Sequence, residues 1–228
     1  MKQTILDQLL KDRANKRPVV LATDISSGTE RLIYPAPDNP DPLNEAAAIA
    51  LRDDKSRVQE TEDGDVFLHA YNPPLRMIIV GAVHIAQPLS QMATTNGFDV
   101  TVVDPRGGFL SPERFPGVDV EPEWPDDALS KLKVDHRTAV VTLTHDPKID
   151  DPALHVALRS PAFYIGCLGS NRTHAKRVER LGADGLSSPE IGRIHGPIGL
   201  DIGAKSPSEI AISILAEVTQ ALRRGDTL

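Results

Sequence analysis

Residues Met77–Ser90, MIIVGAVHIAQPLS, decide the fold, because they read as a short buried strand, a glycine turn and the start of a helix. Sheets that bind nucleotides begin in this way. In the dinucleotide fingerprint G-x-G-x-x-G/A, Gly81 and Ala86 match the first and third positions, whereas Val83 stands at the second. The second glycine lets the backbone approach a pyrophosphate closely. The stretch therefore predicts the sheet while weakening the prediction of ordinary NAD(P) binding.

Downstream of this stretch, apolar strand patterns alternate with helical ones. Strands that are apolar throughout and alternate with helices form a parallel sheet covered on both faces. We therefore predict an α/β fold for residues 74–228, a Rossmann-like, mostly parallel sheet with helices on both faces. The expected strands are 75–80, 99–104, 138–144 and 162–169 with a short one near 118–120, and the expected helices are 85–96, 126–132, 150–159, 171–182 and 206–224.

Residues 1–73 predict a separate, small α+β N-terminal domain. Two prolines in Asn72–Leu75 forbid a helix and disfavour a central strand, so this segment is the expected linker. The expected elements are a helix around Ile5–Leu10, strands at 18–24 and 31–35, a helix at 43–54 and a hairpin at 57–71.

Composition narrows the function. The chain has 25 Lys and Arg against 32 Asp and Glu, a net charge of −7, and only 4% aromatic residues. This balance argues against nucleic-acid binding. The N-terminal segment resembles neither a signal peptide nor a membrane anchor, and no apolar run is long enough to span a bilayer. We expect a cytoplasmic protein, and the single cysteine, Cys167, excludes an internal disulfide.

Candidate ligand-binding residues follow the strands. In open parallel sheets, ligands bind beyond the carboxyl ends of the strands, near the point where the strand order reverses. Glycine, carboxylate, histidine and small polar residues gather at these positions. They are Gly81, Val83 and His84 after the first strand, Asp104 and Arg106 after the second, Thr144, His145 and Asp146 after the fourth, and Gly166, Gly169, Ser170 and Arg172 at the fifth.

Two of these sites have a second interpretation. Asp104 lies where an acid that binds a ribose hydroxyl would sit, but it could equally be a turn residue before Pro105. His145 beside Asp146 suggests a ligand contact or proton-transfer pair. The alternative for Asp146 and Asp150 is capping of the next helix, and we predict no stable metal site.

The segments after residue 166 leave further alternatives open. The helix start at Gly169–Arg172 offers free N–H groups to an anion, or Gly169 serves only close packing. Lys176, Arg177 and Arg180 are expected on a solvated helix face, and Cys167 in a buried strand. Gly196–Pro207, which contains Asp201, is either a functional loop or a buried crossover, with Ile198, Leu200 and Ile202 expected to point inward.

Several motifs in the same order resemble the XdhC/CoxI family, accessory proteins of molybdenum hydroxylases such as xanthine dehydrogenase and carbon monoxide dehydrogenase. The resemblance covers about Arg76 to Leu222. The motifs are RMIIVGAVHIAQPLSQMATTNGFDVTVVDPRGGF (76–109), VTLTHDPKIDDPAL (141–154), YIGCLGSNRTHAKRVERL (164–181) and PIGLDIGAKSPSEIAISILAEV (197–218).

The resemblance implies a Rossmann-like domain that transiently binds molybdenum cofactor (molybdopterin), assists its sulfuration and helps insert it into the apo-enzyme. The implied partners are a molybdenum hydroxylase apo-enzyme, a sulfurtransferase and a second copy of the chain. The family has a glycine where this chain has Val83, and it has a glycine-rich, cysteine-containing N-terminal stretch that residues 1–73 lack. Any role the family assigns to that stretch is therefore either absent here or supplied by a separate partner chain. The residues at matching motif positions are His84, Asp104, Arg106, Thr144, His145, Asp146, Gly166, Gly169, Ser170 and Asp201.

The resemblance implies a carrier that binds and hands over a cofactor, and the residues demand no catalytic turnover, because no set of nucleophile, base and orienting group is evident. Two alternatives remain. The first is an NAD(P)-binding oxidoreductase on the same sheet, and the second is a cofactor-free adaptor that only docks proteins.

Overall fold

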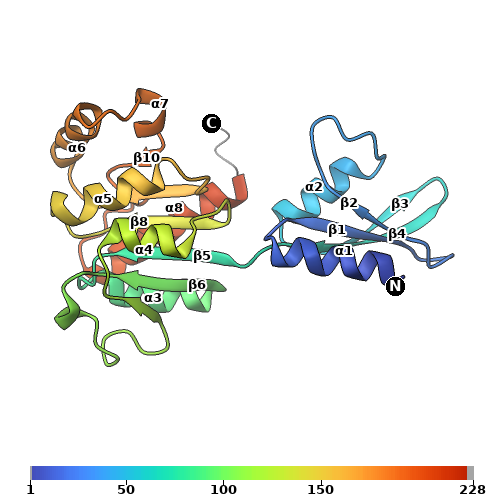
Figure 1. Cartoon of the computed structure of the whole chain (residues 1–228), viewed down its shortest axis with the longest axis horizontal. Coiled ribbons are helices and arrows are strands. Elements are labelled where there is room, and N and C mark those ends of the chain that lie inside the picture. The colour runs from blue at the N-terminus through green and yellow to red at the C-terminus, as the bar shows by residue number, and fades with distance from the viewer. Residues whose placement is uncertain (1, 225–228) are drawn as a thin grey trace. The chain divides into compact units, whose positions relative to one another are not determined.

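The computed structural model describes residues 2–224. The chain divides into two compact units, Met1–Pro73 and Pro74–Leu228. Figure 1 labels the elements of both units.

The N-terminal unit is a four-stranded antiparallel sheet with two helices, as the α+β prediction expected. Its strand order is β2-β1-β4-β3. Val20, Ala22, Ile33, Ala47 and Leu68 belong to its apolar core. The elements are α1 (Gln3–Ala14), β1 (Val19–Asp24), β2 (Glu30–Ile33), α2 (Asn44–Arg52), β3 (Arg57–Thr61) and β4 (Gly64–Tyr71).

The larger unit contains a six-stranded sheet in which every pair of neighbours is parallel. The order is β10-β9-β8-β5-β6-β7. Numbered along this unit, that is the order 3-2-1-4-5-6 of the Rossmann fold, with its reversal between β5 and β8. The predicted fold is confirmed. The strands are β5 (Leu75–Val80), β6 (Phe98–Val103), β7 (Asp119–Glu121), β8 (Thr138–Thr142), β9 (Tyr164–Cys167) and β10 (Ile194–His195).

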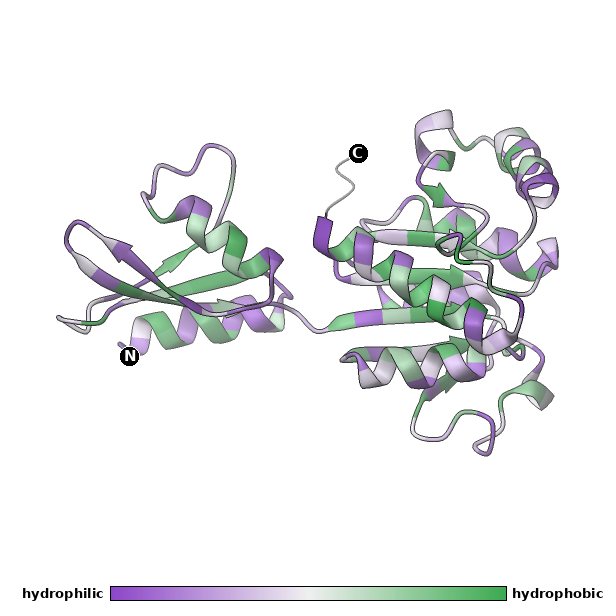
Figure 2. Ribbon diagram, turned by 180° about the vertical axis from the view of Figure 1, so that it is seen from behind, coloured by the Kyte–Doolittle hydropathy of each residue, from purple (hydrophilic) through white to green (hydrophobic). Residues whose placement is uncertain are grey.

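Helices cover both faces of this sheet, because successive side chains of each strand point to opposite faces. Met77 and Ile79 of β5 pack with α3 and α8 in one apolar cluster. Ile78 and Val80 pack with α4, α5 and α6 in the other. Figure 2 shows the resulting apolar strands and amphipathic helices. The helices are α3 (Ala86–Thr95), the short η1 (Gly107–Phe109), α4 (Pro125–Leu132), α5 (Pro147–Ala157), α6 (Asn171–Ala183), α7 (Ser188–Ile191) and α8 (Pro207–Arg224).

Helix capping sets two boundaries. At α8, the Ser206 hydroxyl accepts from the Glu209 N–H and the Glu209 carboxylate accepts from the Ser206 N–H, which forms a capping box. The predicted start of α5 at Asp150 is wrong. Asp146 caps this helix by accepting from the Lys148 N–H, and Pro147 takes the first position, where a missing N–H costs nothing.

The segment between β10 and α8 is held by the Glu217 carboxylate, together with a hydrogen bond from the Ile198 N–H to the Cys167 carbonyl of β9. Glu217 of α8 accepts hydrogen bonds from the Tyr164 hydroxyl and from the Gly199 N–H at 2.7 Å, and its other oxygen lies 3.2 Å from His195 Nδ1. Ile198 is buried as predicted, but the inward orientation predicted for Ile202 is wrong, since its side chain is 54% exposed. Only the first part of this segment is therefore a buried crossover.

Replacing Glu217 by Ala should destabilise the larger unit by about 2–3 kcal/mol, because it leaves the hydroxyl of the buried Tyr164 and the partly buried Gly199 N–H without their acceptor. Urea unfolding followed by circular dichroism and by the fluorescence of Trp124, the single tryptophan, measures the change. The control Gln220→Ala, one turn further along α8, should stay within about 0.5 kcal/mol of wild type. Equal transition midpoints for Glu217→Ala and the control would contradict this role.

Candidate functional site

The reversal of strand order lies where β5 and β8 end side by side. Gly81 adopts φ +106°, and a Cβ added to it would lie 2.4 Å from Thr144 Cγ2. Only glycine fits here without strain, for both the backbone conformation and the contact. The structure thus brings the turn after β5 against the turn after β8, as the strand-end prediction required.

Asp104, at the end of β6, joins the turn after β5 to Arg106. Its carboxylate is fully buried. One oxygen accepts from the Arg106 N–H and Nε, both at 2.9 Å, and the other accepts from the Ala82 N–H and Arg106 Nη2, both at 2.8 Å. Burial acts to raise the pKa of Asp104, but the hydrogen bonds from Arg106 and Ala82 outweigh it, so the pKa lies below its ordinary value.

This arrangement favours the turn interpretation of Asp104 over the ribose-binding one. An ionised carboxylate offers about four acceptor positions, and four protein donors already occupy them. A ribose hydroxyl would have to displace one of these donors. The Asp104–Arg106 pair is therefore a structural clamp at the edge of the sheet.

The turn after β5 packs inward on one side and faces outward on the other. Val83 is partly buried against the apolar cluster formed with α3 and α8, whereas His84 is exposed. Arg114 Nη2 donates to the Ala82 carbonyl at 2.8 Å. The branched side chain at the second fingerprint position is thus part of the packing of α3, and the Ala82 N–H and carbonyl already have partners.

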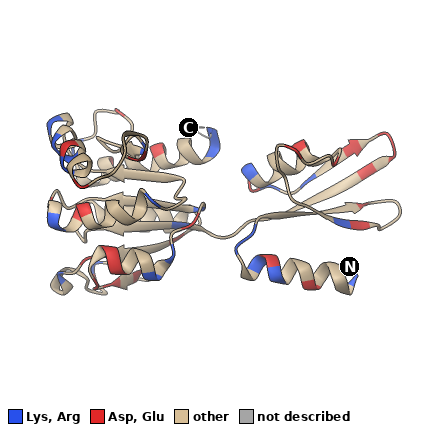
Figure 3. Ribbon diagram, turned by 45° about the horizontal axis from the view of Figure 1, so that its top comes forward, with Lys and Arg blue, Asp and Glu red and all other residues tan. Residues whose placement is uncertain are grey.

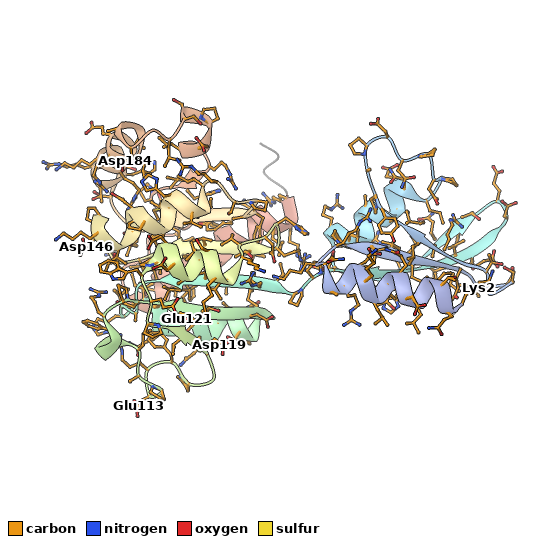
Figure 4. All side chains as sticks on the ribbon, viewed as in Figure 1. Lys2, Glu113, Asp119, Glu121, Asp146 and Asp184 are labelled. Atoms are coloured by element: carbon orange, nitrogen blue, oxygen red, sulfur yellow. The ribbon has the colours of Figure 1, made fainter. Side chains whose placement is uncertain are left out.

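Asp150, in the first turn of α5, binds the turn after β8. Its carboxylate accepts from the Thr144 hydroxyl at 2.7 Å and from the N–H groups of Thr144 and His145 at 3.3 and 3.1 Å. Burial raises its pKa, and these hydrogen bonds oppose that rise. His145 adopts φ +62° and is exposed, so the Asp150 network holds a strained backbone and leaves the imidazole at the surface. Figure 4 labels Asp146 at the same edge.

The placement predicted for Arg177 on a solvated helix face is wrong. Its side chain is 2% exposed and lies on the inner side of α6. Nη2 donates to the Leu168 carbonyl at 2.9 Å and lies 4.0 Å from an Asp150 oxygen. Nε and Nη1 are buried without a hydrogen-bond partner among the described residues. Lys176 is exposed as predicted, and Arg180 is partly buried and pairs with Asp151 at 2.7 Å.

A cavity of about 270 Å³ lies between α6 and the start of α5. It adjoins the exposed imidazole after β8, and basic side chains dominate its wall. The lining residues include His145, Asp150, Arg172, Thr173, Lys176 and Arg177. Of the candidates predicted from sequence, His145 and Arg172 therefore meet at one cavity, together with Arg177, which the sequence did not identify as a site residue.

Other predicted residues have structural surroundings. Gly166 lies inside β9, where a Cβ would lie 2.5 Å from Ile198 Cδ1, so the crossover fills its space. Gly169 has φ +147° and packs against Thr173, and Ser170 caps α6 by accepting from the Thr173 N–H. Asp201 is exposed and does not line the cavity. Cys167 is fully buried as expected, which raises its pKa to about 12.

The His, Cys, Asp and Glu side chains of residues 2–224 form no group of three or more that could hold a metal ion. None of the helices in this range is both long enough and apolar enough to cross a membrane.

The fold and the edge of the sheet define a Rossmann-type domain in which Asp104 and Arg114 hydrogen-bond to the turn after β5. The family described as "XdhC Rossmann domain" matches residues 77–218. The chain belongs to this family, as the resemblance of its motifs predicted.

Curated relatives match about two thirds of this chain at similar levels of identity. A probable xanthine dehydrogenase subunit from Bacillus subtilis is 33% identical over 70% of this chain and 47% of its own length. The "Molybdenum cofactor insertion chaperone PaoD" from Escherichia coli is 32% identical over 65% of this chain and 40% of its own length. The chain thus spans less than half the length of these relatives.

A solved structure covers both units. A protein described as a xanthine dehydrogenase from Bacillus halodurans is 26% identical and matches 97% of this chain and 65% of its own, with a TM-score of 0.69. This likeness supports the fold of the chain.

The Asp104 clamp predicts a pH-dependent loss of stability. Because its folded pKa lies below the ordinary value of about 3.9, its contribution is complete above that pH and is lost as pH falls through the folded pKa. Asp104→Asn, whose amide nitrogen cannot accept, should cost about 2 kcal/mol at pH 7. The difference from wild type should stay constant down to about pH 5 and shrink below about pH 4.

Urea unfolding at several pH values measures this, with the exposed Asp99→Asn on β6 as the matched control. The control should track wild type at every pH. If the difference in the free energy of unfolding between wild type and Asp104→Asn is the same at pH 7 and pH 3, the ionised carboxylate is not the cause of the extra stability of wild type.

Proposed function

We propose that this chain binds molybdenum cofactor and assists its insertion into the apo-enzyme of a molybdenum hydroxylase of the xanthine dehydrogenase or carbon monoxide dehydrogenase type. Membership of the XdhC family and the names of two relatives support this role. The observation that carries it is the basic cavity beside the exposed His145, with a buried guanidinium whose Nε and Nη1 lack acceptors among the described residues.

The residues at this edge fit the cofactor chemically. Molybdenum cofactor is an anionic pterin that carries a dithiolene-held metal and a terminal phosphate. Arg172 and Arg177 supply cationic groups, and the His145 imidazole supplies a polar group beside them. In a hydroxylase, the bound cofactor supplies the redox-active metal. The chain's own contribution is to bind the anionic parts and to hold the pterin against a partly enclosed surface.

The geometry favours a carrier over an enzyme. Tyr164 donates to Glu217 far inside the fold, Cys167 is buried, and Thr144 is bound to Asp150. Within residues 2–224, these potential nucleophiles are engaged in structure or enclosed. His145 is exposed and well placed to contact a ligand that must later leave. This suits a protein that holds a cofactor and releases it unchanged.

The proposal extends to partners. A sulfurtransferase would act on the cofactor while this chain shields it, and a separate chain with the family's N-terminal stretch would supply what residues 1–73 lack. A homodimer and a cytoplasmic location complete the proposal. The form of the cofactor, with a single phosphate or a nucleotide tail, decides how much of the cavity it fills.

Purified protein mixed with the cofactor under anaerobic conditions should retain it through gel filtration, as measured by absorption and by fluorescence of the oxidised pterin. His145→Ala should weaken retention about tenfold, because a hydrogen bond to a charged group is lost. The same variant should slow activation of a cofactor-free hydroxylase.

His136→Ala is the matched control, since His136 is exposed before the amino end of β8 and His145 follows its carboxyl end. Absence of retention by wild type, or equal retention by the His145 and His136 variants together with equal activation, contradicts the proposal. Saturable dinucleotide binding that Asp104→Ala weakens would instead establish the NAD(P) alternative. Hydroxylase binding without any cofactor would establish the adaptor.

A further inference from the structure

We infer that the cavity beside α6 is a phosphate-binding site, built for the terminal phosphate monoester of a ligand and centred on Arg177. For the identity of that ligand the inference rests on the proposed function. The site itself rests on the charges and burial described below. It places the phosphate at α6, whereas a dinucleotide bound through the fingerprint would place its pyrophosphate at the glycine turn after β5.

The strongest support is the state of Arg177. A guanidinium has five N–H donors and is always charged, so burying it without acceptors is unfavourable. The side chain is 2% exposed, and its Nε and Nη1 have no acceptor among the described residues. Its nearest carboxylate, Asp150, lies at 4.0 Å and accepts from Thr144 and His145. Arg177 lines the adjoining cavity, and an anion held there would compensate its buried charge.

The neighbouring side chains make the cavity positive. Arg172, Lys176 and Arg177 line it, and within residues 2–224 their one contact with a carboxylate is the 4.0 Å approach of Arg177 to Asp150. Arg180 also lines the cavity, but its charge is neutralised by Asp151. Three cations thus face one carboxylate in a chain whose net charge is −7. Figure 3 shows Lys and Arg along α6. Such a local field attracts a dianion.

Helix geometry places these cations together. Arg172 and Lys176 are four residues apart and so lie on one side of α6, and Arg177 follows on the inner side. Helix α6 has 13 residues, and Thr173 in its first turn also lines the cavity. First-turn N–H groups have no acceptor within their own helix, although Ser170 accepts that of Thr173. The remaining N–H groups add positive potential at the same end.

A phosphate monoester matches this donor set better than a carboxylate does. Its three terminal oxygens can accept from several donors at once, including the paired N–H groups of a guanidinium. The cavity of about 270 Å³ has room for a phosphate group with bound water, since one water occupies about 30 Å³ in the liquid.

The test uses the full chain and inorganic phosphate at low ionic strength, with binding measured by titration calorimetry and by ³¹P NMR. Wild type should bind phosphate saturably. Arg172→Ala and Lys176→Ala should each weaken binding several-fold, and the double variant about tenfold or more. Both side chains are exposed, so these variants should fold. Arg177→Lys, which keeps the charge but loses the paired donors, should also weaken binding about tenfold.

Arg159→Ala is the control, because it removes one exposed cation outside the lining of the cavity and should leave phosphate affinity unchanged. Absence of saturable binding by wild type, or wild-type affinity in the double variant, overturns the inference.

The outcome separates this site from the proposed function. If phosphate binds as expected but the cofactor is not retained, the phosphate site stands and the cofactor proposal fails. If the cofactor is retained equally by wild type and the Arg172→Ala/Lys176→Ala variant, the cofactor proposal stands and the inference that its phosphate binds here is overturned.

Discussion

The buried carboxylate of Asp150 is the interaction on which the edge of the sheet depends. It accepts from the hydroxyl and backbone of Thr144 and from the backbone of His145, and it faces Arg177 of α6. One side chain thereby fixes the turn after β8, the start of α5 and the inner side of α6. Removing one partner of a buried charge pair leaves the other uncompensated. Because the Asp150 carboxylate accepts from the His145 N–H, His145 keeps an unfavourable backbone conformation although its side chain is exposed.

A second carboxylate performs the corresponding task on the other side of the strand reversal. Asp104 binds the Ala82 N–H and the Arg106 guanidinium, and Gly81 allows the turn after β5 to approach Thr144. The two carboxylates differ in whether they accept hydrogen bonds from the neighbouring arginine. Arg106 makes direct hydrogen bonds to Asp104, whereas Arg177 only approaches Asp150. One half of the edge is therefore closed by protein contacts, and the other half retains unused donors.

The sequence allowed prediction of the parallel sheet, its helices and the gathering of residues at the carboxyl edge, because these follow from apolar periodicity and from the topology of parallel strands. It could not show which polar residues are satisfied by the protein. The sequence left Asp104 equally open to a role as a ribose ligand or as a turn residue, and the structure shows that Arg106 and Ala82 occupy its acceptors. Gly166 looked like part of a binding turn, but Ile198 from a distant segment fills its space. Both outcomes depend on tertiary contacts that no local pattern contains.

Arg177 shows where a local signal existed. It precedes the buried Leu181 by four residues and so lies on the same side of α6, although its charge suggested a solvated position. As a sequence signal for an anion-binding position, a long basic side chain on an apolar helix face is more informative than the number of glycines in the turn after β5. Val83 packs into the core, and the fingerprint turn is tied to Asp104 and Arg114. Since that turn is already engaged, the proposed anionic ligand would bind on the far side of the strand reversal, where Arg172, Lys176 and Arg177 line the cavity beside α6.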